Sequence, residues 1–384
     1  MAQSIPMSFF STVIPVLMRQ ENFSMTAIAL LQLIKIPWLI KFLWSPIIDR
    51  YTSNLGSYKR WIFSSELCYA ALIFSVSLLD IKTDMVLVAV LILLSFIASA
   101  TQDIATDALA IRSFSSGNKS MVNSMQSMGS FAGTLVGSGV LLLIYKKVGW
   151  DIVLPALALF VILAIIPLTR YKDVGKNTLV PKNTKAKATD IFSFFRQKYI
   201  GKQIIYLFLV YSGFMGILSS LKPYMVDLNY SIEQIGLLSG IIGTACGFGA
   251  SYWGGKIVKR QGGYKSRVMF AAMGLVTALY FFAFSLFKDC GYALYLGVAM
   301  LWATYALSTV VVYTTAMEIS REGREGTDFT LQIVITHLSS MVLAIASGRV
   351  IDIFGVSTLF FVEAILGVVT LIFTIFAFKN RDGE

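Results

Sequence analysis

The sequence predicts an all-α, polytopic membrane protein with twelve transmembrane helices in two halves of six. The 384 residues are 56% hydrophobic and only 14% charged, whereas soluble domains carry about 25% charged residues. The mean hydropathy is +0.73. The apolar residues also recur in runs of about 20 residues, the length at which an α-helix crosses a hydrocarbon core of about 30 Å. A soluble core does not need such runs.

Twelve apolar runs define the expected helices. In chain order they cover residues 1–18, 25–46, 61–79, 85–111, 121–145, 151–170, 201–224, 232–254, 268–287, 291–316, 328–350 and 355–378. Residues 171–199 are polar and basic, with six helices on either side. We therefore expect an N-terminal half (1–170), a linker (171–199) and a C-terminal half (200–384). The linker ends in DIFSFFRQK, whose apolar residues suit a short amphipathic helix on the membrane surface.

The basic residues predict the orientation. With both termini in the cytoplasm, 23 of the 32 Lys and Arg residues fall in cytoplasmic segments and seven fall outside. Lys35 and Lys41 lie within a span. The positive-inside rule favours this topology. It also accounts for the net charge of +11, so the partner that we expect is the lipid bilayer and not nucleic acid. The oligomeric state stays open, and a monomer is compatible with the sequence.

The two halves share a sequence pattern. Residues 23–25, FSM, correspond to residues 230–232, YSI, and similar apolar positions follow in both copies. Each copy begins with a serine suited to cap a helix, and Gln234 after Ser231 fits a capping box. Two repeats about an axis along the membrane normal, with a site at their interface, are typical of transporters.

The sequence indicates neither an enzyme nor a cofactor or metal site. Cys68, Cys246 and Cys290 lack metal-ligand spacing, and two of them fall within apolar runs. Nucleotide-binding and hydrolase motifs are absent from the sequence, so the energy source is an ion gradient or the substrate's own gradient. Residues 1–18 barely span a membrane and begin with polar Gln3 and Ser4. We therefore expect a truncated helix 1 and a true start upstream, which in-frame stop codons just before Met1 would refute.

Charged residues inside spans mark pathways or gates, because burying them in a bilayer is costly. Asp103 and Asp107 stand at i and i+4, so they share one face of helix 4, toward its cytoplasmic end. Lys41 lies at a similar depth on helix 2. The further members of this expected cytoplasmic gate are Asp49, Arg50, Lys59, Arg60, Glu66 and Arg112. Two interpretations remain open: a structural ion network that closes the cytoplasmic side, or a proton-binding carboxylate at Asp103 or Asp107.

Three other polar residues, Lys35, His337 and Gln126, are candidates for the substrate or proton pathway. Lys35 lies near the middle of helix 2, where it must contact substrate, pair with a carboxylate or face water. His337, the only histidine, is able to titrate near neutral pH or to serve in packing. Gln126 suits a polar substrate or core packing. Glu363 on helix 12 is compatible with a water-facing position near the outer surface.

A row of small residues marks helix 5. Gly129, Gly133 and Gly137 are four residues apart, and Gly139 follows. Small residues on one face let two helices approach closely. We expect a helix contact here that rearranges during transport.

Several stretches resemble a known family. LIKFLWSPIIDRY (39–51), QDIATDALAIR (102–112), QSMGSFAGTLVGSG (126–139) and residues 206–240 are similar to AmpG-like muropeptide permeases and their acetyl-coenzyme A transporter relatives. The apolar helix followed by an Asp-Arg loop and basic residues also resembles the loop between helices 2 and 3 of major facilitator transporters. The resemblance spans nearly the whole chain.

The resemblance implies a major facilitator fold, an inner-membrane location and proton-coupled uptake of anhydromuropeptides for cell-wall recycling. Carried over by motif, it implies roles for Lys41, Asp49, Arg50, Gln102, Asp103, Asp107, Gln126 and Gly129. Lys35 and Glu66 depart from the pattern, and the extra helix pair of some muropeptide permeases is missing. The alternative functions are transport of another small solute, such as a sugar, a nucleotide- or CoA-like compound or a drug, and a non-transporting membrane receptor or scaffold.

Overall fold

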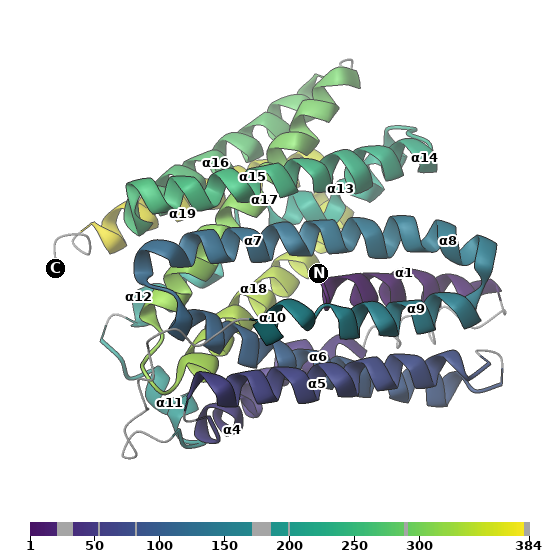
Figure 1. Ribbon diagram of the computed structural model, residues 1–384. Coiled ribbons are helices and arrows are strands. Elements are labelled where there is room, and N and C mark those ends of the chain that lie inside the picture. The colour runs from purple at the N-terminus through teal and green to yellow at the C-terminus, as the bar shows by residue number, and fades with distance from the viewer. Residues whose placement is uncertain are drawn as a thin grey trace. The chain divides into compact units, whose positions relative to one another are not determined.

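The computed structural model describes residues 1–20, 34–52, 54–80, 83–170, 186–198, 200–287 and 291–379 (Figure 1). Throughout these ranges the regular structure is helical, which confirms the all-α prediction. The helices are α1 (Ser4–Gln20), α3 (Ile36–Ile40), η2 (Lys41–Leu43), α4 (Ser45–Arg50), α5 (Leu55–Ser77), α6 (Met85–Ser113), α7 (Ser116–Leu135), η3 (Val136–Val140), α8 (Leu141–Val148), α9 (Trp150–Leu163), α10 (Ile166–Arg170), α11 (Asp190–Phe194), α12 (Ile200–Leu209), α13 (Met215–Asp227), α14 (Ile232–Ile235), η5 (Gly236–Ile242), α15 (Gly243–Gln261), α16 (Gly263–Leu286), α17 (Gly291–Ile319), α18 (Glu325–Phe354) and α19 (Val356–Phe378).

Within these ranges, eight helices are long and apolar enough to cross a membrane. They are Met85–Ser113, Ser116–Val148, Trp150–Arg170, Glu233–Gln261, Gly263–Leu286, Tyr292–Ile319, Glu325–Phe354 and Val356–Phe378, and each coincides with a predicted span. Of the other four predicted spans, 1–18 corresponds to α1 and 61–79 to α5. The span 25–46 lies outside the described residues up to residue 33. The span 201–224 is divided into α12 and α13.

Local signals explain several helix ends. The Asn54 side chain caps α5 by accepting a hydrogen bond from the Ser57 N–H at 2.8 Å. The predicted capping box at α14 is confirmed, because Ser231 N–H donates to Gln234 at 2.9 Å and Gln234 N–H donates to Ser231 at 3.2 Å. The corresponding serine of the first half, Ser24, lies outside the described residues. Gly355 turns the chain from α18 into α19 with φ of +83°, a conformation that side chains rarely adopt.

The chain forms two compact units. The first comprises 1–114, 133–193 and 319–334, and the second comprises 115–132, 194–318 and 335–384. Each unit therefore contains a segment from the opposite predicted half of the sequence. Residues 319–334, from the C-terminal half, belong to the first unit, whereas residues 115–132, from the N-terminal half, belong to the second.

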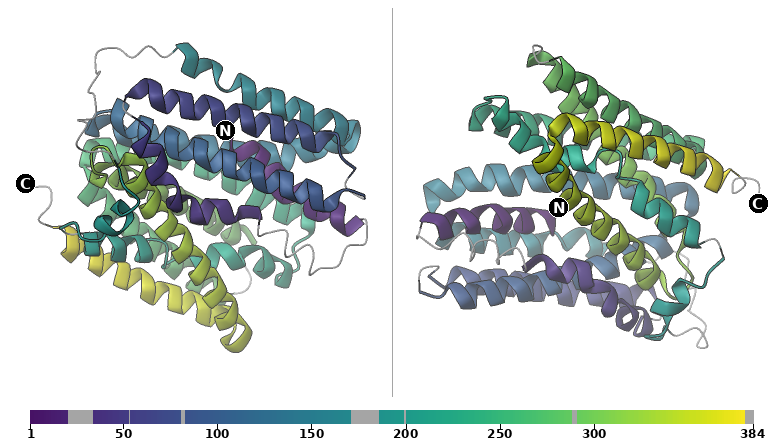
Figure 2. Two further views of the ribbon diagram at one scale, coloured as in Figure 1. Left: turned by 90° about the horizontal axis from the view of Figure 1, so that it is seen from below. Right: turned by 180° about the vertical axis from the view of Figure 1, so that it is seen from behind.

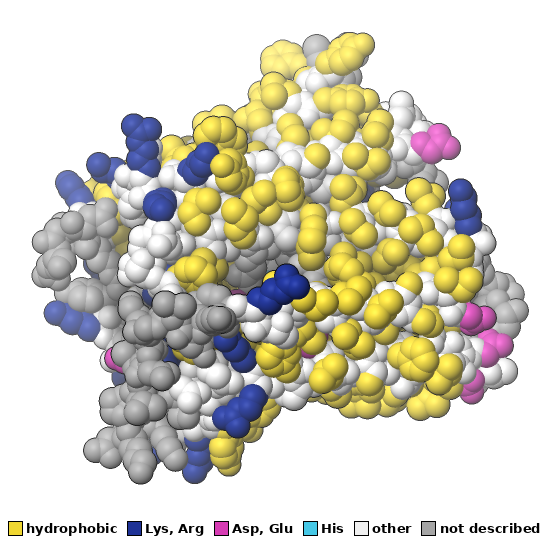
Figure 3. Space-filling model, in the orientation of Figure 1, with side chains coloured by type: hydrophobic (Ala, Val, Ile, Leu, Met, Phe, Trp, Pro, Cys, Tyr) yellow, Lys and Arg dark blue, Asp and Glu magenta, His cyan; other side chains and the backbone are white. Residues whose placement is uncertain are grey.

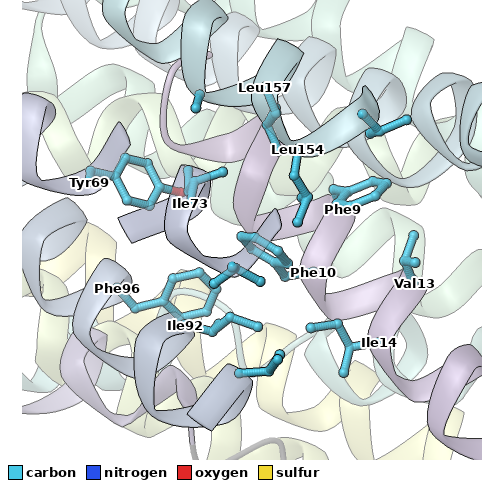
Figure 4. Close-up of a cluster of buried hydrophobic side chains, with 14 of the residues drawn as sticks. Phe9, Phe10, Val13, Ile14, Tyr69, Ile73, Ile92, Phe96, Leu154 and Leu157 are labelled. Carbon is cyan, nitrogen blue, oxygen red and sulfur yellow. The ribbon is translucent and has the colours of Figure 1, made fainter. Parts of the chain in front are cut away.

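In the first unit, α5 packs between α6 and α9 (Figures 1 and 2). Side chains from α1, α5, α6 and α9 meet in one buried cluster, in which Phe9, Phe10, Tyr69 and Phe96 are all fully buried. Figure 4 shows these rings directed toward one another, with aliphatic side chains between them. The aromatic residues fill a core that fixes the four helices relative to one another.

The second unit has a separate core. It is built mainly from α12, α13, α16, α17 and α19, and it includes the fully buried rings of Phe214, Phe281 and Phe360. The Phe281 and Phe360 rings pack edge to face with centroids 5.5 Å apart. This contact joins α16 to α19, which run along each other over most of their length.

The outward faces of the long helices are apolar. Figure 3 shows hydrophobic side chains covering the visible face over α8 and α9. Leu143 on α8 and Ile152 and Leu159 on α9 are each more than half exposed. A continuous apolar surface of this kind suits lipid and not water. The protein is therefore a multi-pass membrane protein by its surface as well as by its helix lengths.

Candidate functional site

A buried ion pair joins η2 to α6 in the first unit. Lys41 Nζ lies 2.5 Å from Asp103 Oδ2, and the Lys41 side chain is almost completely buried. Lys41 Nζ also lies 4.9 Å from the centre of the Trp38 ring, a cation–π contact. The short η2 helix follows α3, which has Pro37 in its first turn, and it directs Lys41 toward α6. Two members of the expected ion network are therefore in direct contact.

Asp49, at the end of α4, caps the N-terminus of α18. Its Oδ1 accepts the Gly326 N–H at 3.0 Å, and its Oδ2 accepts the Thr327 N–H at 2.7 Å and the Thr327 hydroxyl at 2.6 Å. Gly326 and Thr327 lie in the first turn of α18, where N–H groups lack partners within the helix. A carboxylate at this end of a helix is stabilised by the helix dipole. Burial nevertheless raises the pKa of Asp49 to about 7, against the hydrogen bonds from Thr327 and Gly326, which favour the charged form.

A second charged pair lies beside Asp49. Arg112, at the end of α6, approaches Glu325 with Nε 3.6 Å from Oε1. The Arg112 guanidinium also lies 6.0 Å from the centre of the Tyr58 ring, and the Tyr58 hydroxyl donates to Asp49 at 3.5 Å. The first turn of α18 is thus held by side chains from α4, α5 and α6.

The linker and the segment before α18 form a cluster that the sequence did not predict. Arg321 pairs with Asp328 at 2.7 Å and donates to the Ser193 hydroxyl at 2.8 Å, and Arg324 pairs with Asp190 at 2.8 Å. Although burial opposes its charge, bonding to Asp328 keeps the pKa of Arg321 above its ordinary value. Burial likewise opposes ionisation of Asp190, but hydrogen bonds from Lys187 N–H and Arg324 hold its pKa below its ordinary value. These bonds fix α11 against the start of α18.

The docking of α11 should depend on the charge of Asp190. Because its pKa is lowered in the folded protein, the stabilisation is present above its ordinary pKa of 3.8 and is lost as the pH falls through the lower folded value. Asp190→Asn should mimic this loss at neutral pH. We expect amide hydrogen exchange in residues 187–194 to speed up about 5- to 30-fold, the equivalent of about 1–2 kcal/mol. Asp151→Asn, an exposed acid at the start of α9, is the control, and equal exchange in both variants would contradict the assignment.

The other predicted gate residues lie on α4 and α5. Arg50 and Arg60 are exposed, and Arg60 donates to the Ser57 hydroxyl at 3.3 Å. Lys59 is half-buried on the same turn of α5. Glu66 is buried farther along α5. Among the described contacts, Lys41 pairs with Asp103, whereas Asp49 and Arg112 both contact the first turn of α18.

The predicted pathway residues are divided between the units. In the first unit, Lys35 is half-buried at the start of α3, and Asp107 is buried one turn beyond Asp103 on α6. Gln126 on α7 and His337 on α18 are both half-buried and belong to the second unit. Their roles in transport stay predictions.

The glycine row packs against α1. A Cβ atom at Gly133 would lie 2.6 Å from Ser4 Cβ, and one at Gly137 would overlap the Ile5 carbonyl oxygen and lie 2.9 Å from Ser8 Cβ. Gly137 lies within η3, a π-helical turn between α7 and α8. The expected close helix contact is formed at these two positions, while its rearrangement during transport remains a prediction.

Gly137→Ala should destabilise the protein by about 1–3 kcal/mol, because the added methyl meets backbone that cannot move aside. Gly139→Ala is the matched control, since a Cβ there has no described neighbour within 4 Å although it lies in the same π-helical turn. Thermal unfolding of the two purified variants in detergent compares them. Equal transition temperatures would show that α1 does not pack closely here.

A contact in the second unit holds the end of α17. Lys119 on α7 is buried, and its Nζ donates to the Met317 carbonyl oxygen at 3.0 Å. Met317 lies in the last turn of α17, where carbonyl groups lack helical partners and a positive charge is favourable. In the sequence, Lys119 is one of the basic residues of the predicted cytoplasmic segments. The sequence places Lys119 three residues after Ser116, near the start of a helix, and this position is the signal that could have marked it as more than a loop charge.

Comparison with known proteins gives one family. The sequence profile of the Major Facilitator Superfamily matches residues 1–340. The chain is similar to a protein of Escherichia coli K12 named anhydromuropeptide permease, with 20% identity over 365 residues that cover 94% of this chain and 74% of that protein. It is similar to the putative transporter AmpG 1 of Rickettsia bellii, with 22% identity over 384 residues that cover 94% of this chain and 92% of that protein.

Solved structures agree with this fold. The Escherichia coli fucose:proton symporter FucP superposes with a TM-score of 0.76 at 14% identity, over 98% of this chain and 96% of that chain. A bacterial homologue of the iron transporter ferroportin, in an outward-facing state, superposes with a TM-score of 0.74 at 18% identity, again over 98% and 96% of the two chains. At these identities the likeness establishes the fold alone.

Proposed function

Because the chain belongs to the major facilitator superfamily of secondary transporters, we propose that it imports anhydromuropeptides together with protons across the inner membrane. The observation that carries this proposal is the similarity to a protein named anhydromuropeptide permease over 94% of the chain. The buried acidic residues Asp103 and Asp107 on α6 support the proton component, since a carboxyl group in a bilayer is able to carry a proton as a neutral acid.

The proposed orientation places both termini and the linker in the cytoplasm. The excess of Lys and Arg in the corresponding loops supports it. The predicted halves, 1–170 and 200–384, then carry one repeat each, and the cap from Asp49 to α18 lies on the cytoplasmic side. Alternating access requires that this side open for substrate release. The bonds from Asp49 to Gly326 and Thr327 are the contacts that we propose to break at that step.

Uptake of labelled anhydromuropeptide into proteoliposomes tests the function. We expect accumulation under an inward proton gradient, and collapse of that accumulation when an uncoupler is added. Accumulation that the uncoupler leaves unchanged would contradict proton coupling. Failure of uptake by folded protein would contradict the proposed substrate, and competition with a panel of sugars, nucleotides and drugs would then identify another solute.

A further inference from the structure

The predicted span 201–224 is broken within the second unit. Regular helix stops at Leu209 and resumes at Met215, with turns between them. Hydroxyl groups from neighbouring helices satisfy the carbonyl groups that the break exposes. Ser339 donates to the Phe208 carbonyl at 2.7 Å, and Thr370 donates to the Leu209 carbonyl at 3.0 Å. Broken membrane helices form ion and substrate sites in transporters, because their free ends present polar groups inside the bilayer.

A buried carboxyl group lies at the N-terminus of the second helix segment. Glu363 on α19 is 1% exposed, and its Oε1 accepts the Gly216 N–H at 3.2 Å. Gly216 is the second residue of α13, a helix of 13 residues. The expectation that Glu363 faces water is therefore wrong, because α19 packs this face against α13 and α16. A Cβ at position 216 would meet the Glu363 carboxyl group and the Ser347 hydroxyl, so glycine lets the two side chains lie close to the α13 backbone.

The second oxygen of this carboxyl group is unsatisfied. Glu363 Oε2 is buried and has no hydrogen-bond partner among the described residues. The nearby Ser347 hydroxyl donates its single hydrogen to the Leu343 carbonyl at 2.7 Å. This bond competes with Glu363 for the one hydrogen that the Ser347 hydroxyl carries.

The described charged side chains on the surrounding helices do not neutralise the Glu363 carboxyl group. On the helices packed around Glu363, the side chains of Lys222, Asp227, Lys265, Arg349 and Asp352 are exposed. The remaining two cations have other partners: Lys202 donates to the Ala377 carbonyl and Arg267 donates to Gln203. Tyr224 of α13 faces Phe360, one turn from Glu363, and His337 stands ten residues before Ser347, about 15 Å along α18. Within the described chain, Glu363 has no cation at ion-pair distance.

We propose that Glu363 is a proton-binding site that holds its proton on Oε2 while it packs against α13, and releases it to water when that contact opens. An ionised carboxylate without a counter-cation is strongly disfavoured in this surrounding, whereas the neutral acid removes the buried charge and still accepts the Gly216 N–H. Proton loss therefore accompanies movement of α13 away from α19. The proposal rests on the proposed proton coupling and assigns one coupling site to the second unit.

The close approach of two glycines favours such movement at the break. A Cβ at Gly213 would lie 2.8 Å from Gly367 Cα, so the backbones of the broken segment and α19 are almost in contact. Side chains do not interlock at this position. The segment is therefore able to separate from α19 without forcing side chains past one another.

Infrared spectroscopy of the full-length protein in lipid, titrated with protons alone, tests the site. At neutral pH we expect the C=O band of a protonated carboxyl group in the wild type and in Asp352→Asn, a control acid exposed on α18. The component that Glu363 contributes, seen in the difference between the wild-type and variant spectra, should vanish in Glu363→Gln and shift in Glu363→Asp, which keeps a shorter acid. A wild type without any such band, or a Glu363→Gln spectrum identical to that of the wild type, would overturn the proposal.

Transport measurements separate this proposal from the proposed function. In Glu363→Gln we expect gradient-driven accumulation of anhydromuropeptide to fall to the level without a gradient, while exchange at equal pH persists. Unchanged accumulation in this variant, with an uncoupler-sensitive wild type, would overturn Glu363 as a coupling site and leave the transport function standing. If the wild type does not take up muropeptide but shows the band, the substrate fails and the proton site stands.

Discussion

Replacing Lys41 by methionine should lower the free energy of unfolding by about 3–5 kcal/mol, the cost typical of removing one partner from a buried ion pair. The variant leaves the Asp103 carboxylate, at 2.5 Å from the lost ammonium group, buried and without its counter-charge. Methionine nearly matches the length of lysine, so the effect reports charge and not volume. Thermal unfolding in detergent measures it.

The double variant Lys41→Met, Asp103→Leu separates the pair from the packing. Removing both charges should recover most of the lost stability, because an apolar pair of similar volume often replaces a buried ion pair without loss. A double variant as unstable as Lys41→Met alone would mean that the two residues do not act as a pair. Transport by the stable double variant then distinguishes a structural pair, which leaves uptake intact, from a proton-carrying Asp103.

Replacing Asp49 by alanine should loosen the first turn of α18. The change leaves the Gly326 and Thr327 N–H groups without their acceptor, at about 1–3 kcal/mol for each buried donor that finds no other partner. Amide hydrogen exchange at residues 326–328 should speed up accordingly. Asp49→Asn, which keeps one acceptor oxygen, should show a smaller change.

Arg50→Gln is the matched control for Asp49→Ala. It removes a charge from the adjacent residue of α4, but Arg50 is exposed, and surface substitutions usually change stability by less than about 0.5 kcal/mol. If exchange at residues 326–328 is the same in Asp49→Ala and Arg50→Gln, the carboxylate does not hold α18.

The sequence was sufficient to predict the fold because membrane helices carry a strong compositional signal. Each run of about 20 apolar residues can be recognised from its own composition, without knowledge of what the helix contacts. The break between Leu209 and Met215 escaped this method. The interrupting residues, Val-Tyr-Ser-Gly-Phe, are largely apolar and contain no proline, so hydropathy does not register them. Its hydroxyl partners, Ser339 and Thr370, lie far away in sequence.

The candidate site was predictable only in part, because contacts between residues far apart in the sequence leave no signal in hydropathy. Similar depth along two helices predicted Lys41 and Asp103 as members of one ion network, and these two side chains are in contact. Asp49 was recognised as a polar loop residue, but its partners Gly326 and Thr327 lie more than 270 residues later and appear in sequence as an ordinary helix start. Glu363 was misjudged because one helix of nearly uniform apolar composition gives no sign of which face is buried.

Each unit contains a segment from the opposite half of the sequence, so neither half of the chain contains a complete unit. Residues 115–132 and 319–334 each pack in the unit opposite to their predicted repeat. A fragment ending in the linker would therefore lack side chains that complete its own interior, such as the α18 turn over Asp49. The two repeats therefore do not fold independently of each other. A chain split in the linker should reach its folded state only when both fragments are produced together.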